Sequence, residues 1–439
     1  MSSLSTRLRV RKTLRLNIFD GASVFAMAGL TQNYITPFAL ALKATTAQIG
    51  LLNSFPGFAS ALSQLGTPVL VKRAGSRKAV IMWVVFAQAL MWIPVFLVPY
   101  LLGESGVWWL IALFTIAGMF GALSNAPWSS MMADLVHEDV RGRYFSFRGR
   151  INTFTFLAFS LIAGFLLQSL AHNVFLGFAL LFGGAMVFRL LSFNFLARMY
   201  EPPMVVERQR TPSPVEMGKK FLGSNLGKFT LFIALMYFSI MLAGAFFSVY
   251  MLRDLKLSYL TFTLINCSST VSTIVCLRFW GRRADKAGNL KILRITGCLL
   301  PVVPVLWLLN TNPIYLACAN AFSGFVWAGF DLSTGNFLFD ASEAETRTRQ
   351  IALFNCVINV AVGLGSLTGG FIAPHLPSLL GYQLRTLFTL SGVLRAVVVV
   401  LVLSAITEVR HVPRIGILSL LMGRTRHSRG NKKGVNPAH

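Results

Sequence analysis

The chain is dominated by long apolar segments, and this feature most constrains what it can fold into. A helix needs about 20 consecutive apolar residues to cross a bilayer, and runs of that length recur between short polar breaks. Twelve such runs occupy residues 17–42, 49–71, 79–102, 108–132, 151–169, 174–197, 229–252, 260–279, 292–309, 313–339, 351–373 and 386–407. Only 13% of the residues are charged, against about a quarter in a soluble domain. The sequence therefore predicts an all-α polytopic membrane protein with twelve spans.

The basic residues lie mainly on one side of the predicted membrane. The 40 Lys and Arg residues face 15 acidic ones and give a formal net charge of +25, which by itself is compatible with nucleic-acid binding. Most of them, however, lie in the two tails and in the loops after even-numbered spans, whereas the opposite side carries Lys43, Arg253, Lys256 and Arg385. The positive-inside rule then predicts that both termini are cytoplasmic and explains the charge without a nucleic-acid partner. We expect the basic tails and loops to contact anionic lipid headgroups.

Neither a cofactor nor a metal site is predicted. The five cysteines all fall inside predicted spans without metal-ligand spacing, so they are expected to pack as small apolar residues. No phosphate-binding loop, dinucleotide fingerprint or nucleophile elbow stands out, which argues against an enzyme. The basic N-terminal run leads directly into a full-length apolar segment, so we expect it to remain as the first span instead of being cleaved as a signal peptide.

An internal repeat with an offset near 210 residues divides the chain into two halves. At an offset of 213, Asn53 and Ser54 match Asn266 and Cys267. At an offset of 206, the matched positions lie in both loops and spans: Asn125 with Asp331, Asp134 with Asp340, Arg141 with Arg347, Arg143 with Arg349, Ser160 with Ser366, Gly164 with Gly370, and Arg189 with Arg395. Because the pairs keep their order, they indicate a duplication that gives two six-span bundles of the same topology.

The repeat and the composition place the domain boundaries. A basic tail at residues 1–16 precedes a first six-helix bundle at 17–197, and a second bundle at 229–407 precedes a basic tail at 408–439. Between the bundles, residues 198–228 contain two proline-rich stretches and several basic residues. Polar, proline-rich segments resist helix formation, so we expect a cytoplasmic linker here.

The loop after the second span of the second half carries a recognisable signature. Gly281, Asp285, Lys286 and Gly288 follow the spacing Gly-x-x-x-Asp-Arg/Lys-x-Gly, which resembles the motif of major facilitator transporters. The resemblance implies two pseudo-symmetric six-helix bundles, the major facilitator fold, with a gating loop that latches the outward-open state. Gly288 is expected to allow a tight turn, and Asp285 to pair with a cation or a helix N-terminus. A basic anchoring loop with a turn glycine is the alternative.

The corresponding loop of the first half departs from this pattern. Pro68 and Lys72 replace the first glycine and the aspartate, which leaves Arg73, Gly75 and Arg77. The acidic partner is therefore missing in the half where the family usually keeps it. We expect either a weakened gating latch or a plain basic anchor on this side.

A charged element after the fourth span also resembles the family. Arg141, Gly142 and Arg143 are similar to an Arg-Gly-Arg-Tyr element of bacterial major facilitators. Asp134 precedes this element, and Asp340 is its match in the second half. These acids and arginines are expected to link helices on the cytoplasmic face and to separate when the halves rock. A solvated charged loop is the alternative interpretation.

The resemblance implies that the solute site is lined by the first, fourth, seventh and tenth spans. Polar and aromatic residues in these spans are the candidates: Asn33, Tyr34, Asn125, Trp128, Tyr237, Trp327, Asp331 and Asn336. An ionisable side chain inside a span costs on the order of 3 kcal/mol or more in lipid, so Asp331 is expected to face protein or a watery cavity. It either exchanges a proton with that cavity or pairs with a cation such as Arg395.

Three further charged residues fall within spans. Asp20 is expected within about one turn of the cytoplasmic edge, in an anchoring or gating role more than in transport. Arg189 and Arg395 are expected to extend their side chains to the cytoplasmic headgroups, with salt-bridging or anion binding as the alternative.

Together these observations predict a secondary active transporter that moves a small solute or ion by alternating access. Proton coupling through Asp331 is one option for its energy source. The alternative is a transport-inactive receptor or assembly scaffold of the same fold, which the altered first-half motif supports. We expect a monomer in a bacterial inner membrane or a derived internal membrane.

Overall fold

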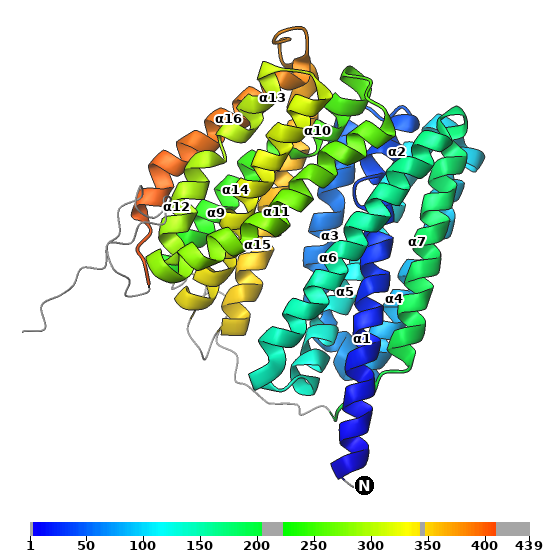
Figure 1. Cartoon of the computed structure of the whole chain (residues 1–439). Coiled ribbons are helices and arrows are strands. Elements are labelled where there is room, and N and C mark those ends of the chain that lie inside the picture. The colour runs from blue at the N-terminus through cyan, green and yellow to red at the C-terminus, as the bar shows by residue number, and fades with distance from the viewer. Residues whose placement is uncertain (1–2, 204–222, 343–346, 410–439) are drawn as a thin grey trace, which may run out of the picture.

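The computed structural model describes residues 3–203, 223–342 and 347–409 as helices joined by short connections (Figure 1). Most of the predicted linker and of the C-terminal tail lies outside the described residues. The predicted N-terminal tail is largely helical, because the first helix already begins at Ser3.

The six predicted spans of the first half fall on its helices, although the helices of the first and fifth spans begin at Ser3 and Glu138, well before the predicted starts at residues 17 and 151. They are α1 (Ser3–Thr31), α2 (Ile35–Ala41), α3 (Thr46–Ala74), α4 (Arg77–Leu102), α5 (Val107–Leu135), α6 (Glu138–Ser169) and α7 (Val174–Ala197). Short 3₁₀ turns at Gly103–Gly106 and Ala171–Asn173 connect two of the pairs. The first span is a broken helix, since α1 and α2 together cover it.

The second half has the same order of helices. They are α9 (Asn225–Gly244), α10 (Phe246–Val249), a π-helical turn (Tyr250–Asp254), α11 (Tyr259–Ala287), α12 (Asn289–Leu299), α13 (Val302–Leu309), α14 (Pro313–Ala341), α15 (Arg347–Ile372) and α16 (Gln383–Val402). Further 3₁₀ turns lie at Ala373–His375 and Leu403–Ala405. The predicted seventh and ninth spans are each divided between consecutive helices.

Local sequence signals set several helix ends. Thr45 and Gln48 form a capping box at the start of α3, and the helix ends at Gly75, whose φ is 66°. Ser258 caps α11 by accepting a hydrogen bond from the backbone of the first turn. Gly288 ends α11 with a φ of 87°, which agrees with the turn predicted from the motif. Glycine is needed at both ends because positive φ is strained for other residues.

Nine segments of the described residues are long and apolar enough to cross a membrane, and one of them, Arg77–Leu135, contains both α4 and α5. The segments of α1 and α3 are not among the nine. Polar residues such as Asp20 and Asn53 interrupt their apolar stretches. Their length and their packing inside the bundle nevertheless match those of the other spans.

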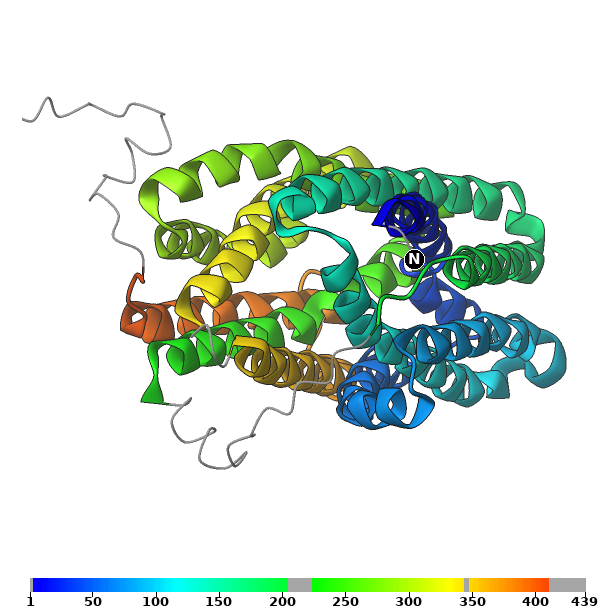
Figure 2. The same cartoon turned by 90° about the horizontal axis from the view of Figure 1, so that it is seen from below.

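The two halves repeat the same packing pattern. In the first half α1 packs against α6 and α7, and α3 packs against α5. In the second half the equivalent helices do the same, since α9 packs against α15 and α16, and α11 packs against α14. The halves meet along two seams, α3 with α15 and α6 with α11, which Figure 2 shows from the end where the chain begins.

The hydrophobic core is continuous between the halves at one end only. There a large buried cluster joins aromatic residues of the first half, such as Tyr34 and Phe38, to Phe246, Tyr250 and Phe262 of the second. The other buried clusters each stay within one half. In Figure 1 the halves converge at the end opposite the N-terminus and diverge toward the end that carries it.

Glycines allow the halves to touch at the joined end. A Cβ on Gly50 would lie 2.8 Å from the Cα of Gly370, so α3 and α15 are in backbone contact there. A Cβ on Gly164 would overlap Thr263 in the same way between α6 and α11. The Tyr34 hydroxyl also lies 2.7 Å from the Thr263 Oγ1, which adds a hydrogen bond between the halves. This end is therefore closed in the structure.

Candidate functional site

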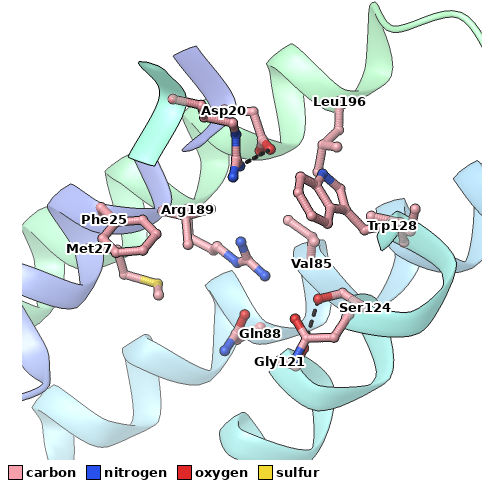
Figure 3. A pocket seen from close by; sticks show the side chains of 14 residues that line it. Asp20, Phe25, Met27, Val85, Gln88, Gly121, Ser124, Trp128, Arg189 and Leu196 are labelled. Carbon is pink, nitrogen blue, oxygen red and sulfur yellow. Dashed lines mark hydrogen bonds and ion pairs between the residues drawn. The ribbon is translucent and has the colours of Figure 1, made fainter. Parts of the chain in front are cut away.

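Helices of the first half line a partly open cavity of about 360 Å³ (Figure 3). This size falls within the range of about 300–1,000 Å³ that is typical of small-molecule sites. Its lining combines apolar side chains with polar ones, and the polar side chains come from five helices of the first half. They are Asp20 on α1, Gln88 on α4, Ser124, Asn125 and Trp128 on α5, Arg148 on α6, and Arg189 on α7. Asn125 and Trp128 were predicted site residues, and the structure places both on this cavity.

A buried charge cluster forms one wall of the cavity. The Ser192 hydroxyl donates to Asp20 Oδ1 at 2.6 Å, and Arg148 Nη2 lies 3.9 Å from Asp20 Oδ2. Arg189 Nη1 donates to the Ser192 hydroxyl at 3.4 Å. The side chains of Asp20 and Arg148 are 4% and 14% exposed, and Arg189 is 5% exposed. The cluster holds one carboxylate and two guanidinium groups away from bulk water.

The expected positions of these charged residues were wrong. Asp20 is buried instead of lying within reach of water and the basic tail. Arg189 and Arg395 do not extend to headgroups, because they are 5% and 2% exposed. Arg189 is held by Ser192 and by the charge of Asp20, whereas Arg395 donates to Ser391 Oγ at 3.2 Å and to the Leu300 carbonyl at 3.1 Å. Polar partners on the same helix and on neighbouring segments therefore hold both arginines inside the protein.

A hydrogen-bond network positions Trp128 and Arg148 at the cavity. Trp128 Nε1 donates to Asn17 Oδ1 at 3.3 Å, and Asn17 Nδ2 donates to the Tyr144 hydroxyl at 2.7 Å. Arg148 Nε donates to the Asn17 carbonyl at 3.2 Å, and its guanidinium carbon lies 4.6 Å from the Trp128 ring centre. A Cβ on Gly21 would lie 2.7 Å from Arg148 Nη2, so the glycine leaves room for the guanidinium. Sequence reasoning missed Arg148, since it lies in a basic stretch that reads as a loop.

A second polar group lies in the other half and contains three of the predicted residues. The Tyr237 hydroxyl on α9 donates to Asp331 Oδ1 on α14 at 3.3 Å. The Tyr237 ring lies 5.8 Å from the Trp327 ring and 6.4 Å from the Phe330 ring. Asp331 is exposed although it lies within a span. Its carboxylate therefore contacts Tyr237 rather than Arg395, whose guanidinium bonds elsewhere.

The remaining predicted solute-binding residues lie apart from these two groups. Tyr34 is fully buried, and its hydroxyl donates to the Ser160 carbonyl at 2.7 Å beside Thr263 of the other half. Asn33 Nδ2 donates to Ser160 Oγ at 3.5 Å. The structure places both at the closed end between the halves. Asn336 instead donates to Asn289 Oδ1 at 3.3 Å, near the start of α12.

In the first half, the altered motif receives its acidic partners from elsewhere in the chain. Arg77 is buried and donates to Asp134 Oδ2 at 2.6 Å. Glu201, just after α7, accepts hydrogen bonds from the backbone of Arg77 at 2.7 Å and from Ser76 Oγ at 2.6 Å. Its carboxylate therefore caps the N-terminus of α4, where the helix dipole favours negative charge. Arg73 remains exposed.

In the second half, polar residues beside the motif form contacts similar to those of the first half, and the gating role of Asp285 stays a prediction. Gly281, Asp285 and Lys286 lie on α11 itself, and the two charged residues are exposed. Asn289 Nδ2 donates to Asp340 Oδ2 at 2.7 Å. The carboxylate of Glu408 accepts from the backbone of Leu290 at 2.9 Å and caps α12, as Glu201 caps α4.

The arginine element after the fourth span belongs to α6. The helix begins at Glu138, so Arg141 and Arg143 lie in its first turns instead of in a loop. Arg141 Nη2 donates to the carbonyls of Ala133 at 3.0 Å and Val136 at 3.3 Å, and thereby joins α6 to the end of α5. Arg143 is exposed. These contacts stay within one half.

Removal of the α4 cap should lower stability. We expect Glu201→Ala to cost about 1–2 kcal/mol, because it removes a carboxylate that caps a helix and faces the buried Arg77. Thermal unfolding of the purified protein would measure this as a Tm lower by a few degrees. Glu104→Ala is the matched control, since its pair with Lys43 is exposed at 68% and 73% and should contribute little. Equal Tm values for the two variants would contradict a capping role for Glu201.

Comparisons with known proteins agree with this architecture. The family model of the Major Facilitator Superfamily matches residues 21–241 and 229–419. No curated protein sequence matches the chain. Among solved structures, the nucleoside transporter NupG is 14% identical with a TM-score of 0.69, over 90% of this chain and 98% of that chain.

Two other structures are similar to the same degree. A bacterial homologue of the human lysosomal transporter Spinster, inward-facing and occupied, is 14% identical over 94% of this chain and all of that chain, with a TM-score of 0.69. A D-xylose–proton symporter is 13% identical over 91% and 98% of the two chains, with a TM-score of 0.67. At these identities the structures establish the fold, and the family model covers both halves. The chain therefore belongs to the Major Facilitator Superfamily, a family of multi-pass membrane transporters and not of enzymes.

Proposed function

We propose that this protein is a secondary active transporter that moves a small polar solute by alternating access. One observation carries the proposal: the halves share a buried core at one end and separate cores elsewhere. For the halves to rock against each other, they must be in contact at one end of the molecule and separated at the other, as they are here. The similar structures include a nucleoside transporter and a D-xylose–proton symporter, which favours a small polar solute.

The distribution of charge supports an inward-facing conformation. The exposed basic residues Arg73, Arg143 and Lys286 lie near the ends of α3, α6 and α11 that are remote from the closed end. The positive-inside rule assigns such residues to the cytoplasm, so the closed end is the outer one. We propose a bacterial inner membrane or a derived internal membrane as the location. The same basic residues would contact anionic headgroups, and a monomer is sufficient for this mechanism.

Polar contacts inside each half support rigid-body movement. Arg77 pairs with Asp134 within the first half, and Asn289 bonds to Asp340 within the second. Because neither contact crosses between the halves, each bundle can rotate without breaking it. The scaffold alternative was based on the absence of an acidic residue from the first-half motif. Asp134 and Glu201 provide acidic partners for Arg77 of this motif, which supports the transporter.

We further propose that Asp331 couples solute movement to protons. Its carboxylate is accessible inside a span and bonds to Tyr237, so it can exchange a proton when the surrounding space opens to either side. Tyr237 and Trp327 provide the amphipathic surface beside it that is typical of small-molecule sites.

Flux across a membrane tests the proposal directly. The protein would be reconstituted in proteoliposomes and supplied with radiolabelled nucleosides, pentoses and small organic acids under an inward proton gradient. We expect accumulation of one class of solute that collapses when an uncoupler removes the gradient. If a solute binds to the purified protein but never crosses the vesicle membrane, the receptor or scaffold alternative replaces the transporter.

A further inference from the structure

The cavity of the first half contains more positive than negative charge. Asp20 is the carboxylate of the buried cluster, whereas Arg148 and Arg189 both contribute guanidinium groups. Arginine stays protonated in proteins, so the three side chains carry a net charge of about +1. A buried charge without a partner is strongly unfavourable, and this excess would be neutralised by an anion in the cavity.

Two buried polar atoms at the cavity lack partners among the described protein atoms. They are the Nε of Arg189, a donor, and the Oε1 of Gln88, an acceptor. Both residues are more than nine-tenths buried. Figure 3 shows the Arg189 guanidinium and the Gln88 amide pointing into the same space between Asp20, Trp128 and Ser124. Buried polar groups are nearly always hydrogen-bonded, so the two atoms indicate what a ligand would offer here.

The protein fixes both side chains in these orientations. The Gln88 amide nitrogen donates to the Ala117 carbonyl at 3.1 Å, which leaves its oxygen directed into the cavity. Arg189 is held on one side by Ser192, and Ser192 in turn donates to Asp20. The free donor and the free acceptor are therefore built into the bundle and do not depend on mobile side chains.

The equivalent arginine of the second half provides an internal comparison. Arg395 matches Arg189 in the repeat and is equally buried. Its Nε donates to Ser391 Oγ at 3.2 Å and its Nη1 to the Leu300 carbonyl at 3.1 Å. The second arginine thus has its hydrogen bonds supplied by protein, whereas the first leaves a donor directed at the cavity. The difference points to a ligand-binding role for Arg189 in particular.

We propose that this cavity binds a small organic anion that carries a hydroxyl group beside a carboxylate. The carboxylate would accept hydrogen bonds from Arg189, since a guanidinium matches the two oxygens of a carboxylate. The hydroxyl would donate to Gln88 Oε1. Apolar neighbours such as Val85 and Met27 favour the carbon skeleton of an organic acid over a bare inorganic ion. Binding of the anion is inferred from the cavity itself, whereas the role of this anion as the transported solute rests on the proposed transport function.

Binding in detergent tests the site without requiring transport. Purified protein would be titrated with L-lactate and D-gluconate, with the neutral lactamide and with inorganic phosphate at constant ionic strength. Unfolding temperature and calorimetry would report binding. We expect a saturable rise in Tm with lactate or gluconate and none with lactamide, because the amide lacks the negative charge. The same stabilisation by phosphate would indicate a site for any anion and would overturn the proposal.

Matched substitutions locate the binding. Gln88→Leu should weaken the affinity about tenfold by removing one hydrogen bond, and Arg189→Lys should weaken it at least as much by removing the planar donor pair. Arg395→Lys is the control and should leave the affinity unchanged. Should Arg189→Lys fail to fold, Gln88→Leu still decides the question, because it removes only one neutral polar group.

The outcomes separate this inference from the proposed function. Binding of lactate or gluconate that is lost in Gln88→Leu, without flux in proteoliposomes, would support the site and contradict transport. Gradient-driven flux of a neutral solute, without stabilisation by either organic anion, would support transport and overturn the anion site. An affinity that is unchanged in both Gln88→Leu and Arg189→Lys would also overturn it.

Discussion

Asp331→Asn should abolish uphill accumulation of the solute while leaving solute exchange across the membrane. Asparagine has nearly the same shape as aspartate and can still accept the hydrogen bond from Tyr237, but it cannot gain or lose a proton. Net uptake driven by a proton gradient should fall by roughly a hundredfold, which corresponds to about 2.7 kcal/mol. Exchange of labelled for unlabelled solute needs no proton release and should persist. Both rates are measured in the same proteoliposomes.

The control for this prediction is an exposed acid outside the predicted sites. Glu104 lies in the 3₁₀ turn between α4 and α5 and is 68% exposed, and Glu104→Gln removes the same charge without touching Tyr237. Its effect on coupling should be small. Loss of both accumulation and exchange in Asp331→Asn would mean that the carboxylate binds the solute itself. Unchanged accumulation would show that Asp331 has no part in coupling.

Gly370→Leu should prevent the joined end of the two halves from closing and should stop transport in a folded protein. A Cβ built on Gly370 would lie 2.8 Å from the Cα of Gly50 on α3, so a leucine side chain has no space while the halves are joined there. Each half can still form its own core, so the variant should fold. We expect transport to fall more than tenfold, since the closed state would require a shift of backbone against backbone.

The matched control is a glycine that has space around it. Nothing lies within 4 Å of a Cβ built on Gly183 of α7, so Gly183→Leu should keep most of the activity. Both variants add the same apolar side chain to a spanning helix, so the two proteins should be expressed and inserted into the membrane to a similar extent. Similar activities for the two would indicate that α3 and α15 need not approach each other during transport.

The architecture was largely predictable, because lipid imposes a simple rule on the chain. Each span must be long, apolar and helical, and all twelve predicted runs fall on helices of the structure. The repeat placed the two halves by matching landmarks such as Asp134 with Asp340. Where a helix end depended on a local signal, as at Gly288, the residue and its positive φ were also predictable.

The candidate site was less predictable, because apolar composition does not say which face of a helix turns inward. Arg189 lies in an apolar run and is equally consistent with a surface or a buried position. Its partners Ser192 and Asp20 come from the same helix and from a distant one, and only packing brings them together. Asn125, Trp128 and Asp331 were identified because their helices were expected to line the solute path.

The glutamates that cap α4 and α12 follow the internal repeat. Glu201 and Glu408 lie 207 residues apart, close to the repeat offset of 206, and each follows the last span of its half. Each also caps the helix that follows the motif loop. The repeat in the sequence therefore pairs these two acids, although each lies beyond the last predicted span of its half.

Distances measured at both ends of the molecule test alternating access most directly. Spin labels would be placed in a cysteine-free background on Thr46 and Arg253, which are in contact at the closed end, and on Arg73 and Arg347 at the opposite ends of α3 and α15. Electron resonance would then record both distances with and without solute and a proton gradient. Alternating access predicts that the first distance lengthens as the second shortens, with both states populated. Two distances that stay fixed under every condition, or that change together, would contradict it.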